Sequence, residues 1–156
     1  MALMAKQFKL IFLFLFLLSL SSFGQSEEFD FVFGIEQQRY FSLEFGIASV
    51  ERNSDFTYSD VHLCAEALFA KNERPAFGGK IGFDHSFFAL FQAGIQLGGY
   101  GNKDAAVFLL RPEVGVTFFG FLDVLLGYNI FMVKENMDMS DLAVALRVKI
   151  PHGFFK

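Results

Sequence analysis

Two-residue alternation of apolar side chains recurs in short segments along most of this chain, and it limits the possible folds more than any other feature. Residues that form turns (Gly, Asn, Asp and Pro) separate the segments. We expect strands at residues 30–37, 40–49, 58–70, 76–84, 87–98, 106–118, 121–132 and 140–150. One face of each segment has no charged or amide residue, whereas the other mixes charged residues with glycine. Because successive side chains of a strand point to opposite faces of a sheet, this pattern predicts an all-β protein.

The first 24 residues have the pattern of a secretory signal peptide. A positively charged start precedes an apolar run at residues 10–18, and the small residues Ser22 and Gly24 stand at the end of the segment. A helix that spans a membrane needs about 20 apolar residues, so this run is too short to be one. We therefore expect residues 1–24 to be a cleaved leader and residues 25–156 to form one exported domain.

The composition excludes two broad classes of protein. Hydrophobic residues make up 53% of the chain and charged residues 19%, which is too apolar for an intrinsically disordered protein. The formal net charge is -4 and no cluster of Lys and Arg is present, so no nucleic-acid partner is expected. Cys64 is the single cysteine, so no intramolecular disulfide can form, and we expect it to be a small buried side chain.

Alternation is compatible with two kinds of barrel. A soluble, lipocalin-like barrel turns its apolar face inward around an apolar ligand, whereas a membrane barrel turns it outward to lipid. The polar face also carries Val32, Leu125 and Phe131, which makes it a poor surface toward water. The lumen of an eight-stranded barrel is only wide enough for side chains to fill, so it cannot hold the many phenylalanines of the apolar face. We therefore predict a closed antiparallel up-and-down transmembrane β-barrel of about eight strands. The alternative is a secreted lipocalin-like carrier, although lipocalins usually have a Trp in the first strand and this chain has none.

The polar face predicts a network of charges inside the lumen. We expect it to consist of Glu36, Glu44, His62, Glu66, Lys80, Arg111, Glu113, Asp123, Arg147 and Lys149. Five acids against four bases are close to balance, and we expect Asp30, Asp60, Asp84 and Asp141 to lie at strand ends within reach of water. A salt-bridged plug is favoured over a path for protons or ions, because eight strands leave no aqueous channel. The residues expected to face lipid include Phe33, Phe45, Leu63, Phe91, Val114, Leu126 and Leu146.

No pattern typical of catalysis or metal binding is present. His62, Cys64 and Glu66 share one face of a strand and form the one Cys/His/Glu group of the sequence, which we interpret as core filling. The three histidines do not have metal-ligand spacing, so neither a metal nor a cofactor is expected. The glycine-rich segment 98–101 precedes no predicted helix and is interpreted as a loop. The segment 51–60 is interpreted as a solvated loop, with binding of a partner as the alternative.

Several short segments carry a resemblance to a known class of proteins. They are Ser-Phe-Gly at residues 22–24, Arg-Pro-Glu-Val-Gly at 111–115, Phe-Gly-Phe-Leu-Asp at 119–123 and Gly-Tyr-Asn at 127–129. With these segments the chain resembles the small outer-membrane β-barrel proteins of Gram-negative bacteria, in particular the compact ones of Bacteroidota. The resemblance implies a location in the outer membrane, with its lipids and the barrel-insertion machinery as partners. It also implies a structural role or interaction through loops, without catalysis.

Three features depart from this class. Pro112 falls within a predicted strand, where it removes a ladder hydrogen bond, so we expect a bulge or kink there. Pro151 interrupts the last strand early, and the chain ends on Lys156 instead of an aromatic residue. A long loop at 50–57 would lie on the side of the N-terminus, where such barrels have short turns. We expect short turns at 85–86 and 119–120 and longer loops at 99–105 and 133–139.

Overall fold

The computed structural model describes residues 29–54, 57–70, 74–88 and 90–152. The leader expected at residues 1–24 lies outside them. The strands are β1 (Phe29–Gln37), β2 (Phe41–Ser54), β3 (Thr57–Phe69), β4 (Ala76–Phe87), β5 (Phe91–Gly101), β6 (Ala106–Phe118), β7 (Leu122–Tyr128), β8 (Ile130–Glu135) and β9 (Leu142–Pro151). Among the described residues, no helix is long and apolar enough to cross a membrane.

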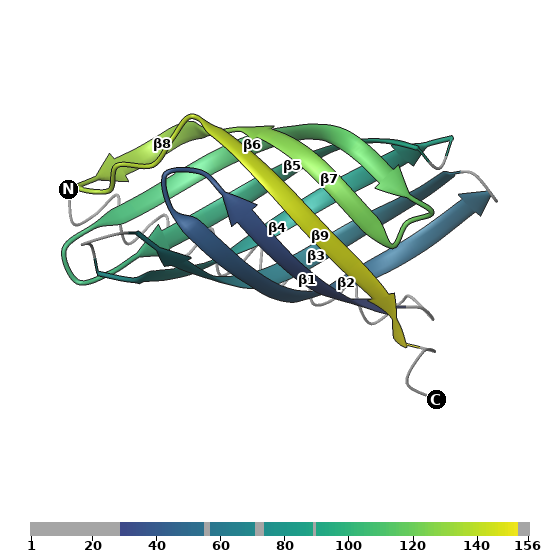
Figure 1. The fold of residues 1–156 in the computed structure, drawn as a ribbon, viewed down its shortest axis with the longest axis horizontal. Coiled ribbons are helices and arrows are strands. Elements are labelled where there is room, and N and C mark those ends of the chain that lie inside the picture. Colours follow the sequence, from purple (N-terminus) through teal and green to yellow (C-terminus); the bar gives the residue numbers. More distant parts are fainter. Residues whose placement is uncertain (1–28, 55–56, 71–73, 89, 153–156) are drawn as a thin grey trace.

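The strands close into an antiparallel barrel. Each of β1 to β6 pairs with the next strand along the chain, and β9 pairs with both β1 and β7 (Figure 1). Both β7 and β8 pair with β6, one after the other along the same edge, and together they take the place of one strand. The wall therefore has eight strand positions, which we call staves. The closed up-and-down barrel that the alternation predicts is confirmed, with one strand divided in two.

Strands β7 and β8 are separated at Asn129, within the segment 121–132 that the sequence predicts as one strand. The β6 pairing with β7 ends at Glu113, and its pairing with β8 resumes at Leu110. The unpaired stretch between them contains Pro112, which has no backbone N–H to donate. The ladder is therefore interrupted beside Pro112, which lacks the donor. The register is the same on both sides of this gap, so the bulge expected at Pro112 is not found in the described pairings. The shift in register lies instead between Phe108 and Leu109.

The two ends of the barrel differ in the length of their connections. We call the short-turn end the one where β2 is followed by β3, β4 by β5 and β6 by β7, and the long-loop end the one where β1 is followed by β2, β3 by β4, β5 by β6 and β8 by β9. The first strand begins and the last strand ends at the short-turn end. A long loop at 50–57 is therefore wrong, because β2 continues to Ser54 and β3 begins at Thr57, directly opposite it. Glu51 and Arg52, whose charge is typical of a loop, extend a paired strand.

The turn expected at 85–86 is also displaced. Strand β4 continues to Phe87 and β5 begins at Phe91, directly opposite it, and Leu90 N–H donates to the Phe87 carbonyl. The predicted hairpin at 119–120 is confirmed. Residues 119–121 connect Phe118 to Leu122, which lie opposite each other; Phe121 N–H donates to the Phe118 carbonyl, and Phe119 and Gly120 both have positive φ angles, 53° and 75°.

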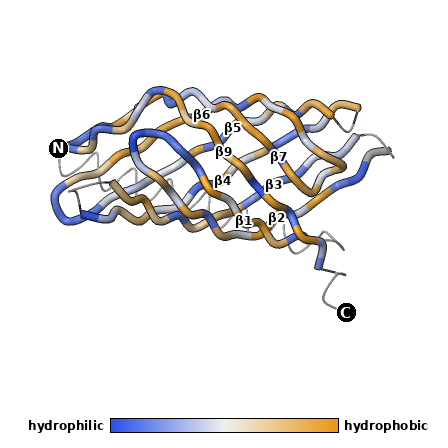
Figure 2. The backbone as a smooth tube through the Cα atoms, in the orientation of Figure 1, coloured by the Kyte–Doolittle hydropathy of each residue, from blue (hydrophilic) through white to orange (hydrophobic). Residues whose placement is uncertain are grey.

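The wall of the barrel is apolar outside and polar inside. Along most strands, apolar and polar residues alternate (Figure 2), whereas the first four residues of β8, Ile-Phe-Met-Val, are all apolar. Phe45, Phe91 and Leu126 point outward and are 53%, 59% and 49% exposed, whereas Arg111 and Arg147 point into the lumen and are fully buried. Glycines on the inner face make room for these long side chains. A Cβ at Gly127 would lie 2.6 Å from Cδ of Arg111, which is closer than packing permits.

Candidate functional site

The charged face predicted by the sequence lines the lumen. All ten residues expected there are buried: Glu36, Glu44, His62, Glu66, Lys80, Arg111, Glu113, Asp123, Arg147 and Lys149. Seven of the nine described strands contribute to this set, and β5 and β8 do not. The seven positions expected to face lipid lie on the outer face: Phe33, Phe45, Leu63, Phe91, Val114, Leu126 and Leu146. Leu63 is half-buried there, because the neighbouring strands place Ile47 and Ile81 on either side of it.

Arg147 of β9 joins three strands across the lumen. Its Nε donates to Oε1 of Glu44 at 3.0 Å, and Nη1 donates to Oδ2 of Asp84 at 3.1 Å. Nη2 donates to Oε2 of Glu113 at 3.4 Å. The guanidinium has several N–H donors in a fixed plane, which lets one side chain hold carboxylates of β2, β4 and β6 together.

Lys80 and Arg111 form the neighbouring part of the network. Nζ of Lys80 lies 2.8 Å from Glu44 and 3.5 Å from both Glu36 and Glu66. Arg111 pairs with Glu36 through Nη1. Each carboxylate that these cations contact is itself buried, so the ion pairs are shielded from bulk water.

Lys149 holds the network toward the short-turn end. Its Nζ lies 2.6 Å from Asp60 and 3.0 Å from Asp123, with Asp84 at 3.8 Å. The expectation that Asp60 and Asp84 lie in reach of water is wrong, since they are 1% and 0% exposed. Strands β3 and β4 continue past both residues, which places them inside the barrel instead of at its rim. Asp30, at the start of β1, is 6% exposed, so it too is buried and does not lie in reach of water.

The near balance of charges expected in the lumen is therefore also wrong. With Asp60 and Asp84 included, seven buried acids face four buried bases in the described residues, before Asp30 is counted. Neutral donors satisfy part of the surplus: Tyr100 Oη donates to Glu66 at 2.8 Å and Gln96 Nε2 donates to Glu113 at 2.7 Å. The parity of β3 and β4 would have identified both aspartates, because each lies an even number of residues from a lumen residue on its strand.

Asp60, His62 and Asp84 lie close enough to one another to suggest a metal site. Their ligand atoms are all within 4.8 Å, and His62 Nδ1 lies 3.1 Å from Asp60. However, Lys149 already contacts Asp60 at 2.6 Å and Arg147 contacts Asp84 at 3.1 Å. Two cationic side chains therefore compensate these carboxylates, and the geometry favours an ion-pair network over a metal centre.

The Cys/His/Glu group of β3 is not assembled for nucleophilic chemistry. His62 contacts Asp60 and Gln96, and Glu66 accepts hydrogen bonds from Ser42 and Tyr100. Cys64 packs against Val32, Ala48 and Val50, with Tyr58 beside them, and its thiol also contacts the Glu44 carboxylate. A nucleophile needs its base within hydrogen-bond reach, and the imidazole here is engaged with other partners.

A hydrophobic cap closes the lumen at the long-loop end. Met137 and Met139, from the connection between β8 and β9, are both 2% exposed and pack in one cluster with Tyr40, Tyr100 and Leu109. The sequence predicts this segment as a loop and gives no reason to place it inside. Its one signal is the two-residue spacing of the methionines, which turns both side chains to the same side.

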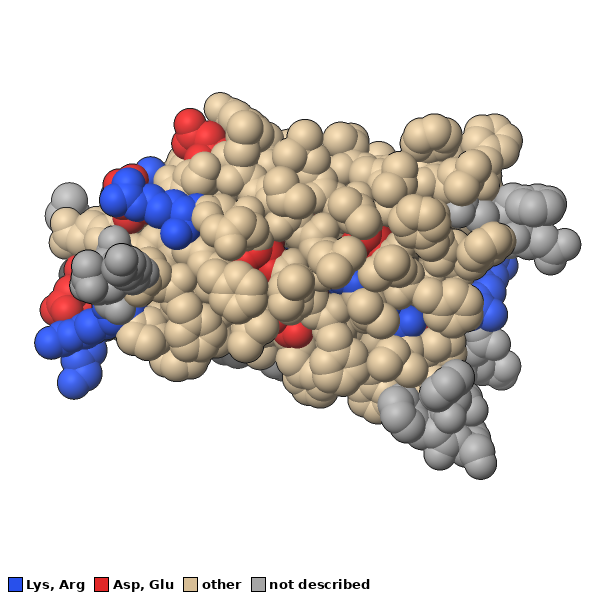
Figure 3. Space-filling model, in the orientation of Figure 1, with Lys and Arg blue, Asp and Glu red and all other residues tan. Residues whose placement is uncertain are grey.

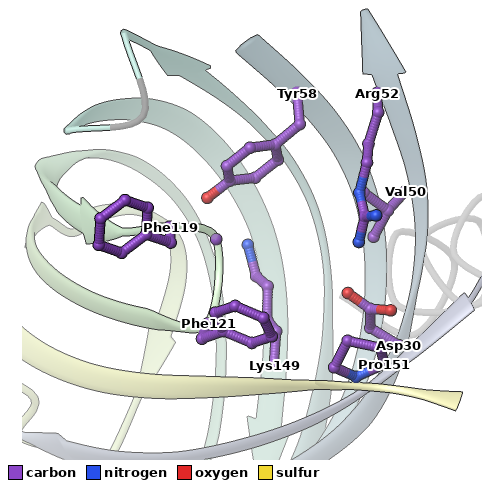
Figure 4. Close-up of a pocket in the computed structure, with 9 residues that line it drawn as sticks. Asp30, Val50, Arg52, Tyr58, Phe119, Phe121, Lys149 and Pro151 are labelled. Atoms are coloured by element: carbon purple, nitrogen blue, oxygen red, sulfur yellow. The ribbon is translucent and has the colours of Figure 1, made fainter. Parts of the chain in front are cut away.

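A cavity of about 490 Å³ opens at the short-turn end (Figure 4). Lys149 rises from its floor beside the Tyr58 ring, and the Arg52 guanidinium points toward Asp30. The Tyr58 hydroxyl lies 2.9 Å from Oγ1 of Thr117 and donates to Gln92 at 3.2 Å. The polar groups at its floor are therefore engaged with one another, and the cavity ends on the buried charge network.

We expect the protein to form no open pore. The cap and the charge network both block the lumen, so purified protein in planar lipid bilayers should give no steady conductance. Replacing the capping side chains (Met137→Ser with Met139→Ser) should leave the barrel closed, because the ion pairs of Arg147 and Lys80 lie beneath the cap. A stable open level in recordings of the unmodified protein would contradict the interpretation of the lumen as a plug.

Comparison with protein-family models, with curated proteins and with solved structures gives no match for this chain.

Proposed function

We propose that this chain is an integral outer-membrane β-barrel with a lumen closed by side chains, and that its role is structural or based on interactions of its loops, without catalysis. The observation that carries this proposal is the polarity of the wall. Large apolar side chains are exposed all around the outside, whereas the charged residues of the strand centres are buried inside. Apolar contacts suit hydrocarbon, and closure pairs every described strand on both edges except β8, which pairs with β6 alone.

The same polarity disfavours a soluble carrier. A lipocalin-like barrel holds an apolar ligand in an apolar lumen and presents a polar surface to water. Here Lys80, Arg111 and Arg147 occupy the centre of the lumen, and an apolar ligand would have to displace their ion pairs. In water, the exposed phenylalanines would form an apolar surface far larger than soluble monomers normally carry.

The difference between the two ends supports one orientation. Barrels of the outer membrane have short periplasmic turns and longer extracellular loops. Exposed ion pairs gather at the long-loop end, as Arg39 with Asp138 and Arg74 with Asp104. Figure 3 shows these charges mainly at that end, beside a broad band with only small charged spots. We therefore orient the long-loop end toward the cell exterior, with both ends of the described chain in the periplasm.

This proposal includes the expected route to the membrane and the expected partners. Export through the leader at residues 1–24 would deliver the chain to the periplasm. The barrel-insertion machinery would then place it among the outer-membrane lipids. The loops at the exterior would be the surface available to other molecules.

Fractionation of cells tests the proposal. We expect the protein to remain with the outer membrane after alkaline and high-salt washes, and to migrate differently in SDS gels before and after heating, because closed barrels resist SDS until they are heated. A protein found in the soluble periplasm, with one mobility at both temperatures, would contradict the proposal and favour the soluble carrier.

A further inference from the structure

The outer wall has a groove of about 800 Å³ across strands β2 to β6. Its floor is one row of small side chains, since Ala65, Gly79 and Gly99 lie opposite one another on adjacent strands. Phe45 continues this row on one side and Phe108 on the other. The Phe108 ring lies against Gly99, where an added Cβ would be 2.8 Å from it. The groove is therefore a depression between two aromatic walls.

The groove is closed toward the short-turn end and opens toward the long loops. The next row on the short-turn side consists of the larger side chains Leu63, Ile81 and Leu97. On the other side, Gly101 and Ala106 lie opposite each other and leave the way along β5 and β6 open. A long flexible chain could thus enter from the long-loop end and lie on the floor of the groove.

Basic residues lie at the open end of the groove. Arg74 precedes β4 and Lys103 follows β5, and both are exposed. Arg74 Nη1 lies 3.0 Å from Asp104, which shows that the two connections are adjacent. In the described residues of these two connections, the bases Arg74 and Lys103 accompany one acid, Asp104, whereas residues 134–141 hold one base and three acids. The excess of positive charge is therefore on the groove side of this end.

The floor of the groove lies within the depth of one leaflet from the basic residues. Strand β5 ends at Gly101, two residues beyond Gly99, which is about 7 Å at roughly 3.3 Å per residue, and Lys103 lies in the connection that follows. A strand tilt of about 40° reduces this strand length to a depth of about 5 Å. Half of a hydrocarbon core of about 30 Å is about 15 Å, so a lipid with its phosphate at Lys103 has acyl chains long enough to reach the floor.

We propose that the groove binds an acyl chain of an anionic, phosphate-bearing lipid from the leaflet at the long-loop end, with the phosphate between Arg74 and Lys103. This inference rests on the proposed membrane location, where hydrocarbon is the medium that fills any outer groove. The volume lies within the range of about 300–1,000 Å³ that is typical of ligand sites. The apolar walls bind the chain, and the two cations select the headgroup.

Lipid quenching of a single tryptophan tests this proposal, because the chain has no Trp of its own. In the Phe77→Trp variant the indole lies at the groove, and in the Leu126→Trp variant it lies on β7, outside the groove. Each variant is reconstituted in vesicles of phosphatidylcholine with a fraction of brominated phosphatidylglycerol or brominated phosphatidylcholine. We expect brominated phosphatidylglycerol to quench the groove indole with an apparent affinity about fivefold higher than brominated phosphatidylcholine. The difference corresponds to roughly one additional contact between a basic residue and the anionic headgroup. The reference indole should show no preference.

Matched variants in the Phe77→Trp background separate the two parts of the site. Ala65→Phe fills the floor and should abolish the preference, whereas Ala93→Phe, at an outward alanine of β5 outside the groove, should preserve it. Arg74→Gln with Lys103→Gln should also abolish it. Arg39→Gln, which removes another exposed ion pair of the same end, should not.

The outcomes distinguish failure of this inference from failure of the proposed function. If neither brominated lipid quenches the indole at position 126, the membrane location itself is wrong. If that indole is quenched but the indole at position 77 shows equal affinity for both lipids, the groove has no headgroup selectivity and the inference is overturned. An indole at position 77 that no lipid reaches, together with a dimer in the same vesicles, would instead make the groove an interface between copies.

Discussion

Replacing Arg147 with methionine is expected to destabilise the folded barrel by about 3–5 kcal/mol, the usual cost of removing one partner from a buried ion-pair network. The substitution leaves Glu44 and Asp84 without the guanidinium that lies 3.0 and 3.1 Å from them. Neither carboxylate can turn to water, since both are buried. We expect the midpoint of urea unfolding in lipid vesicles to fall strongly, or the heat-sensitive folded band in SDS gels to be lost.

Two further variants show whether the cost arises from unpaired charge. Adding Glu44→Gln and Asp84→Asn to Arg147→Met should restore part of the lost stability, because the two carboxylates that lose the guanidinium are then neutral, while Lys80 keeps Glu36 and Glu66 at 3.5 Å. Arg39→Met, which removes a more exposed cation, should change the free energy of unfolding by less than about 1 kcal/mol. A barrel that tolerates Arg147→Met as well as Arg39→Met would refute the role of the lumen network in holding the staves together.

Placing an arginine on the outer wall at Leu146 is expected to cost about 2–4 kcal/mol in a bilayer, as charged residues do at the midplane of membrane barrels. Leu146 is near the middle of β9 and points outward, 38% exposed. Urea unfolding of Leu146→Arg in vesicles measures the effect. For a barrel surrounded by water, the same change would only exchange an exposed leucine for an exposed charge.

Leu142 provides the matched control on the same strand and the same face. It lies at the long-loop end of β9 and is 55% exposed. Leu142→Arg should cost at most about 1 kcal/mol, because an arginine near the boundary can reach water and headgroups. Equal, small effects of both substitutions would indicate that no hydrocarbon surrounds the wall.

Much of the fold follows from the parity of apolar residues, whereas the strand ends do not. The alternation predicts the barrel and its inner and outer faces because a one-residue slip would turn every side chain of a strand around. It fails at 51–54 and 84–87, where charged or histidine residues end the apolar pattern but the backbone ladder continues. Backbone pairing depends on the neighbouring strand, which a single segment does not reveal.

The sequence predicts which residues belong to the charged network, but not which of them form ion pairs with one another. Parity places Arg147 and Glu44 in the lumen, yet only the stagger of the closed barrel determines that they meet. The cap of Met137 and Met139 could not be predicted, since the two-residue spacing of the methionines turns both to one side but does not show that this side faces the lumen. The break in the seventh stave at Asn129 could not be predicted either, because it depends on Pro112 of the neighbouring strand.

The contact between the outer wall and hydrocarbon is tested most directly by the fluorescence of the Leu126→Trp variant in vesicles with bromine at known depths of the acyl chain. We expect blue-shifted emission and strong quenching by bromine in the chain region, while the buried aromatic site of the Tyr40→Trp variant should not be quenched. Emission typical of an indole in water, unchanged by any brominated lipid, would contradict a membrane-spanning barrel.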